Sequence, residues 1–112
     1  MKGVSKEDFV KLLNIIEDLE DFLESLALNQ TPYFVRFLEQ MKCNLKTCIT
    51  IGYQDWENID RVIKRDWQEA NDTFLGIPGF EMPGKTMEEK IERTFLFFGY
   101  IKTIDSIVTG EK

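Results

Sequence analysis

Apolar residues near the start of the chain recur at a helical spacing, and this constrains the fold more than any other feature. Between residues 5 and 28 they alternate steps of three and four positions. Such a pattern places one apolar stripe along a single face of an α-helix. We therefore predict a long amphipathic helix that buries this stripe: Phe9, Leu12, Ile16, Leu19, Leu23 and Leu26.

Three more helices are predicted from the same periodicity, over about residues 31–52, 55–76 and 86–110. Capping residues support these limits. The predicted N-terminal caps are Ser5, Thr31 with Pro32, Asp55 and Thr86, and the predicted C-terminal stops are Asn29, Gly52, Gly76 and Gly110. The third helix is expected to bury one face: Trp56, Ile59, Ile63, Trp67, Ala70 and Phe74.

The connectors between the predicted helices decide how those helices are arranged. The connectors at 29–31 and 52–55 are short, which favours antiparallel neighbours. With 112 residues, of which 43% are apolar, the chain has the size and composition of one globular domain. We expect an all-α fold, an antiparallel up-down-up-down four-helix bundle over residues 1–112.

The stretch GIPGFEMPGK, residues 76–85, joins the third and fourth predicted helices and carries three apolar side chains between two Pro-Gly pairs. Each Pro-Gly pair favours a type II turn. Two interpretations are open for Ile77, Phe80 and Met82. They fold back over the open end of the bundle and cap its core, or they form a rigid binding loop with Phe80 as the anchor.

The formal net charge of −6 is concentrated in the first predicted helix, which carries seven acidic residues and two lysines. Five of these acids lie close together: Glu17, Asp18, Glu20, Asp21 and Glu24. The second helix, by contrast, is net positive. An acidic chain is a poor direct ligand for nucleic acid. The acidic face is either a solvated surface or a surface that meets a basic protein partner.

The chain contains no histidine, which removes imidazole-based catalysis and the usual zinc sites. The two cysteines, Cys43 and Cys48, point in different directions from one helix, so a disulfide between them is not expected. The first residues lack the apolar segment of a signal peptide, and the longest apolar run, at 95–101, is too short to span a membrane. We expect a cytoplasmic protein without a cofactor, a catalytic residue or a metal site.

Two carboxylate pairs, Glu17-x-x-Glu20 and Glu57-x-x-Asp60, suggest an alternative. Carboxylates at this spacing on facing helices can hold magnesium. The arrangement is similar to the ExxE…ExxD pattern of the all-α nucleoside triphosphate pyrophosphohydrolases, the MazG-like and dimeric dUTPase group. That similarity implies magnesium-dependent nucleotide hydrolysis. Two features depart from it: a whole predicted helix separates the pairs, and the heptad phase puts Glu17 on the outer face of its helix.

The fourth predicted helix is apolar nearly all round over residues 95–101. Such a helix is either central in its bundle or in contact with another subunit. A homodimer would use Leu96, Tyr100 and Ile107 as a self-complementary contact.

Small size, the acidic face and the apolar loop together favour a non-enzymatic protein-binding module. Within that class we expect a small acidic inhibitor or immunity-type protein that masks a basic site on a partner. The predicted binding residues are the five clustered acids at 17–24, with Ile77, Phe80 and Met82 of the loop. The alternative function is a magnesium-dependent all-α nucleotide pyrophosphohydrolase that uses the paired carboxylates.

Overall fold

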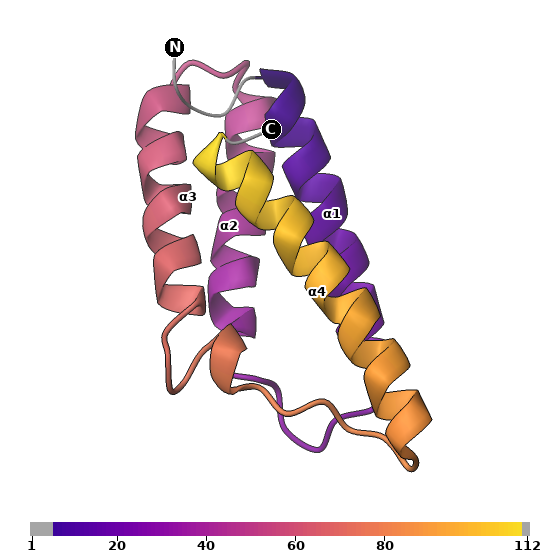
Figure 1. Cartoon of the computed structure of the whole chain (residues 1–112). Coiled ribbons are helices and arrows are strands. Elements are labelled where there is room, and N and C mark those ends of the chain that lie inside the picture. Colours follow the sequence, from indigo (N-terminus) through magenta and orange to yellow (C-terminus); the bar gives the residue numbers. More distant parts are fainter. Residues whose placement is uncertain (1–5, 111–112) are drawn as a thin grey trace.

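The computed structural model describes residues 6–110 and is all-helical over that range, without a strand (Figure 1). The helices are α1 (Lys6–Ser25), α2 (Val35–Thr50), α3 (Trp56–Ala70) and α4 (Met87–Thr109), with a short 3₁₀ turn, η1 (Ile77–Gly79), between α3 and α4. The prediction of an all-α chain with four helices is confirmed. None of the helices within residues 6–110 is both long and apolar enough to cross a membrane.

The four helices pack against one another to different extents. α1 packs against α2 and α4, and α2 also packs against α3, whereas the contact between α3 and α4 is small. Figure 1 shows α4 crossing the other helices obliquely, with its first turns projecting away from α2 and α3. One face of α4 is consequently left without a neighbouring helix along its first half.

The apolar seam of α1 forms the centre of the core, as its spacing predicts. Phe9, Leu12, Ile16 and Leu19 are completely shielded from solvent. The seam packs with one buried row from each of the other helices, and with Ile77 of the α3–α4 connector. These rows are Leu38, Met41, Leu45 and Cys48 of α2, Ile63, Trp67 and Ala70 of α3, and Phe97, Ile101, Ile104 and Val108 of α4.

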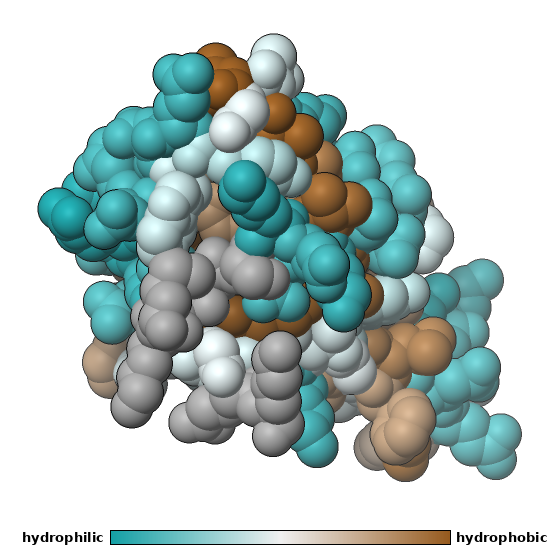
Figure 2. Space-filling model, turned by 90° about the horizontal axis from the view of Figure 1, so that it is seen from above, coloured by the Kyte–Doolittle hydropathy of each residue, from teal (hydrophilic) through white to brown (hydrophobic). Residues whose placement is uncertain are grey.

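The predicted dimer row on α4 lies largely against α1. The Tyr100 ring packs on Phe22, with ring centroids 5.7 Å apart, and Ile107 is also partly buried against the core. Leu96 alone of the three predicted contacts is well exposed, at 47%. The exposed apolar row of α4 is a different one, and Figure 2 shows apolar side chains gathered on the right of the molecule, where the first half of α4 projects.

Capping is confirmed for α4 and differs at the other helix starts that the structure describes. Thr86 Oγ1 accepts a hydrogen bond from the Glu89 backbone N–H at 3.1 Å. Thr31 does not cap α2, which begins only at Val35, and Asp55 precedes α3 without a side-chain capping bond. The predicted cap at Ser5 lies outside the described residues.

The helix ends follow backbone conformation more than the predicted stop residues. Gly52 and Gly110 adopt the left-handed conformation, both with φ of 75°, as expected for residues that end α2 and α4. At the end of α1, however, the left-handed residue is Ala27, with φ of 52°, and not Asn29.

The third helix ends at Ala70, earlier than predicted, and this changes the position of Phe74. Asp72 Oδ1 accepts hydrogen bonds from the backbone N–H groups of Phe74 and Leu75, at 3.0 and 2.8 Å. Such bonds give the backbone an alternative to helix continuation. Phe74 is consequently 86% exposed, and the prediction that it shares the buried face of α3 is wrong.

The α3–α4 connector does not contain the predicted type II turns. Those turns need a positive φ at the second central residue, and neither Gly79 nor Gly84 has one. The first Pro-Gly pair instead lies in η1, which follows Gly76. A side chain at Gly76 would not fit, because its Cβ would collide with the carbonyl oxygen of Ala70. The chain therefore folds back tightly onto the end of α3.

Three apolar residues of this connector, Ile77, Phe80 and Met82, cover the end of the core. Ile77 is 3% exposed, and Phe80 and Met82 are partly buried against the core. The Phe80 ring lies 5.5 Å from that of Phe34 and 5.4 Å from that of Phe97, between centroids. The packing therefore agrees with the core-capping interpretation of this segment.

Replacing Phe80 by alanine should lower the free energy of unfolding by about 2 kcal/mol, because two aromatic contacts and part of a buried ring are lost. Phe74→Ala, in the same connector, is the matched control and should change stability by less than about 0.5 kcal/mol, since that ring is exposed. Urea denaturation followed by circular dichroism measures both. Equal effects of the two substitutions would contradict the capping role.

Candidate functional site

The structure divides the five clustered acids of α1 into an inner and an outer set. Glu17 and Glu20 turn toward α2, where Glu17 Oε2 lies 3.8 Å from Lys46 Nζ and Glu20 Oε1 lies 2.7 Å from Lys42 Nζ. The outer set is Asp18, Asp21 and Glu24, all three exposed. Within residues 6–110, no member of the outer set forms an ion pair.

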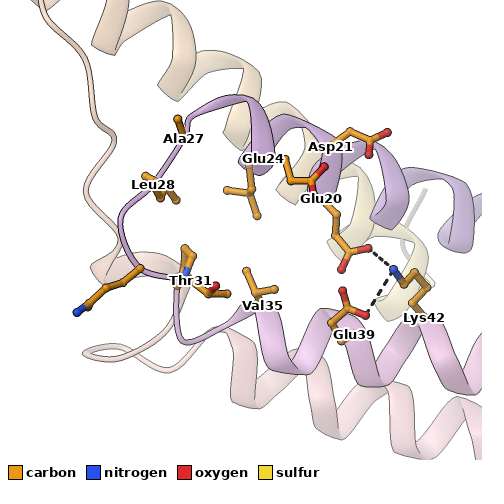
Figure 3. A pocket seen from close by; sticks show the side chains of 12 residues that line it. Glu20, Asp21, Glu24, Ala27, Leu28, Thr31, Val35, Glu39 and Lys42 are labelled. Atoms are coloured by element: carbon orange, nitrogen blue, oxygen red, sulfur yellow. Dashed lines mark hydrogen bonds and ion pairs between the residues drawn. The ribbon is translucent and has the colours of Figure 1, made fainter.

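Glu20 of the inner set belongs to a three-residue cluster with Glu39 and Lys42, between α1 and α2. Lys42 Nζ lies between two carboxylates, 2.7 Å from Glu20 Oε1 and 3.4 Å from Glu39 Oε2. Figure 3 shows Glu20 and Glu39 pointing toward each other across the space between the helices, with Lys42 bonded to both. The cluster therefore has two carboxylates for one ammonium group.

The second carboxylate oxygen of Glu20, Oε2, is buried and accepts no hydrogen bond from any described residue. Two ionised carboxylates facing each other repel, and a buried acceptor without a donor is costly. A proton shared between Glu20 and Glu39 removes both problems, because one carboxyl group then donates to the other.

The pKa shifts of the cluster agree with a shared proton. Burial raises the pKa of Glu20 to about 7; Glu39 acts in the same direction and Lys42 opposes it. The hydrogen bond from Glu20 lowers the pKa of Glu39, whose side chain is 56% exposed, compared with 15% for Glu20. The hydrogen bond to Glu20 raises the pKa of Lys42. Below pH 7 the proton therefore resides mainly on Glu20, next to an ionised Glu39.

The cluster forms one wall of a pocket of about 600 Å³ between the end of α1, the start of α2 and the connector that joins them, here called the α1–α2 pocket (Figure 3). Its charged side chains are Glu20, Asp21, Glu24, Glu39 and Lys42. Its apolar side chains are Leu23, Ala27, Leu28, Pro32 and Val35, and Gln30 and Thr31 complete the lining.

This combination suits a long basic side chain. Lysine and arginine place an apolar stem along hydrophobic surface and present a cationic end group to carboxylates. Leu28, Pro32 and Val35 offer the surface for the stem, and Glu20 with Glu39 offers oxygens for the end group. The arrangement has the groups needed to accept a cation by charge and hydrogen bonding, and the pocket lining holds no thiol or hydroxyl nucleophile other than Thr31.

Three of the four carboxylates of the magnesium hypothesis pair with lysines. Glu17 and Glu20 pair with lysines of α2, and Asp60 Oδ2 lies 3.0 Å from Lys64 Nζ on its own helix. In the part of the chain that the structure describes, no group of three or more Asp, Glu, Cys or His side chains is close enough to hold a metal ion. The structure thus gives no support for a site that joins the pairs.

Glu39 and Lys42, both on α2, were not among the residues predicted for the site. The sequence contains one signal for a pairing with α2, which is a matching spacing. Glu20 follows Glu17 by three positions, and Lys46 follows Lys42 by four. Both intervals match one helical turn, so two facing helices can pair these residues in register. The predicted loop residues Ile77, Phe80 and Met82 do not line the α1–α2 pocket.

Comparisons with family models, with curated proteins and with solved structures give no match for this chain.

Glu20→Gln tests the shared proton through the pH dependence of stability. A folded-state pKa of about 7, above the ordinary 4.5, means that stability is lost as pH rises through the folded value. Glutamine does not titrate, so the variant does not lose this stability. The free energy of unfolding of the variant minus that of the wild type should therefore be about 2 kcal/mol larger at pH 8 than at pH 5.

Glu24→Gln is the control for that experiment, because Glu24 is exposed and should give the same difference from the wild type at both pH values. Denaturant unfolding at pH 5 and pH 8 supplies all the values. A difference between Glu20→Gln and the wild type that does not change with pH would contradict the shared proton.

Proposed function

We propose that this chain is an up-down-up-down helical bundle that acts in the cytoplasm as a non-enzymatic protein-binding module. Within that class we propose a small acidic inhibitor or immunity-type protein that masks a basic site on its partner. The observation that carries the proposal is the outer acidic set of Asp18, Asp21 and Glu24. These carboxylates are exposed and form no ion pair within the described residues, and Asp21 and Glu24 also line the α1–α2 pocket.

The outer acidic set provides the long-range part of recognition. Unpaired carboxylates on one surface of a chain with net charge −6 attract a basic protein and orient it before contact. Lys42 and Lys46 neutralise only the inner carboxylates, so the negative potential of the outer set is retained.

The α1–α2 pocket provides the short-range part. An arginine or lysine of the partner that enters the pocket places its end group against Glu20 and Glu39 and takes the place of their shared proton. Arginine is frequent among the residues that dominate binding energy when it fills a desolvated pocket. Binding at this site therefore releases a proton and becomes tighter as pH rises from 6 to 8.

The residue types around the site favour binding over catalysis. The chain has no histidine, and the inner carboxylates are occupied by lysines of α2. The carboxyl pair can receive a cation in place of its proton, and the lysines leave no free general base next to a nucleophile.

An affinity pull-down with matched charge variants tests the proposal. The wild type, immobilised and incubated with lysate of its source at low salt, should retain one stoichiometric basic protein that is released at high salt. Asp18→Lys combined with Asp21→Lys should lose this protein, because the outer carboxylates that attract it become cations. Mass spectrometry of the eluates identifies and quantifies it.

Glu57→Lys combined with Glu69→Lys is the control, since both side chains are exposed on α3 and the net charge changes by the same amount. It should retain the partner. Retention by the α1 variant, or equal loss from both variants, would show that the outer acidic set is not the contact surface.

A further inference from the structure

A second surface, on the opposite side of α4 from the core, goes beyond the proposed function. Four apolar side chains of α4 are exposed there: Met87 at 71%, Ile91 at 62%, Phe95 at 80% and Phe98 at 54%. They follow one another at intervals of four, four and three residues, so they form one row on the helix, here called the outer α4 row. Figure 2 shows apolar side chains gathered where this part of α4 projects.

The exposed area of the outer α4 row is large for a monomer. Four side chains of this size and exposure present on the order of 500 Å² of apolar surface, which reaches the size of the largest patch on a typical monomer. Two such rows against each other remove about 1,000 Å² from water, which is the lower limit for a specific interface. The area is therefore sufficient for a weak dimer of this chain.

Gly99 beside the row leaves space for a neighbouring helix. It lies in the middle of α4, where glycine is less favourable than alanine. A Cβ at this position would meet no atom within 4 Å, so no close approach within the described chain requires glycine there. A second helix packed against the row would make use of the missing side chain.

The charges around the row are self-complementary in one orientation. Glu88 and Lys102 lie seven residues before and after Phe95, two helical turns on either side, and so share its face. Neither forms an ion pair with another residue between 6 and 110. When two copies of α4 pack antiparallel about a two-fold axis at Phe95, Glu88 of each copy meets Lys102 of the other. A parallel pair would instead oppose like charges.

We propose that the outer α4 row is a self-association surface, on which a second copy of this chain packs its own α4 in antiparallel orientation about Phe95. The contact is isologous: Ile91 of each copy lies near Gly99 of the other, and the two Phe95 rings meet at the axis. The predicted row of Leu96, Tyr100 and Ile107 is not this surface, since Tyr100 and Ile107 pack toward the core of their own chain.

Analytical ultracentrifugation over a concentration series, from micromolar to millimolar, tests the proposal. The wild type should move from 13.2 kDa toward twice that mass as concentration rises. Phe95→Glu should remain at 13.2 kDa throughout. Phe74→Glu is the matched control, an equally exposed phenylalanine with the same charge change, and should associate like the wild type.

A charge exchange tests the antiparallel orientation. Glu88→Lys alone should weaken association severalfold, even though it lowers the net negative charge, and Glu88→Lys with Lys102→Glu should restore it. A wild type that stays monomeric at the highest concentration would overturn the proposal and leave the row to a different partner. Loss of association in Phe74→Glu as well as in Phe95→Glu, or no rescue by the double exchange, would also overturn it.

Discussion

The apolar seam of α1 packs against α2 on one side and against α4 on the other. Its residues Phe9, Leu12, Ile16 and Leu19 are completely buried, and they contact the rows that the other helices contribute to the core. Because the seam is narrow and strictly spaced, burying it sets the rotation of α1 about its own axis. This rotation determines which of the other α1 side chains face a neighbouring helix and which face solvent.

The acidic segment at 17–24 acquires its two roles from this rotation. Glu17 and Glu20 flank the seam on the side of α2, where Lys46 and Lys42 hold them, and the remaining acids face water. One stretch of sequence thus supplies both an internal charge cluster with a titrating carboxyl group and an unpaired acidic surface, which we propose as the contact for a basic partner. The same fold leaves α4 with a buried row and an exposed row, since only α1 packs extensively on it.

The spacing of apolar residues was sufficient to predict four helices and the buried seam of α1, because helix burial depends on a pattern that repeats along the chain. The helix ends were less predictable, since they depend on local backbone bonds. Asp72 ended α3 early and left Phe74 in solvent. Of the α1–α2 pocket only the α1 half was predicted, because its other half, Glu39 with Lys42, is set by the register between two helices.

Amide chemical-shift mapping of the isotope-labelled protein, titrated with the partner captured from lysate, tests the central claim most directly. If the acidic half of α1 and the α1–α2 pocket form the binding surface, the largest changes should fall at residues 17–24 and around Val35 and Lys42. Changes concentrated in α3 at residues 56–70, with residues 17–24 unaffected, would contradict this account of how the protein binds.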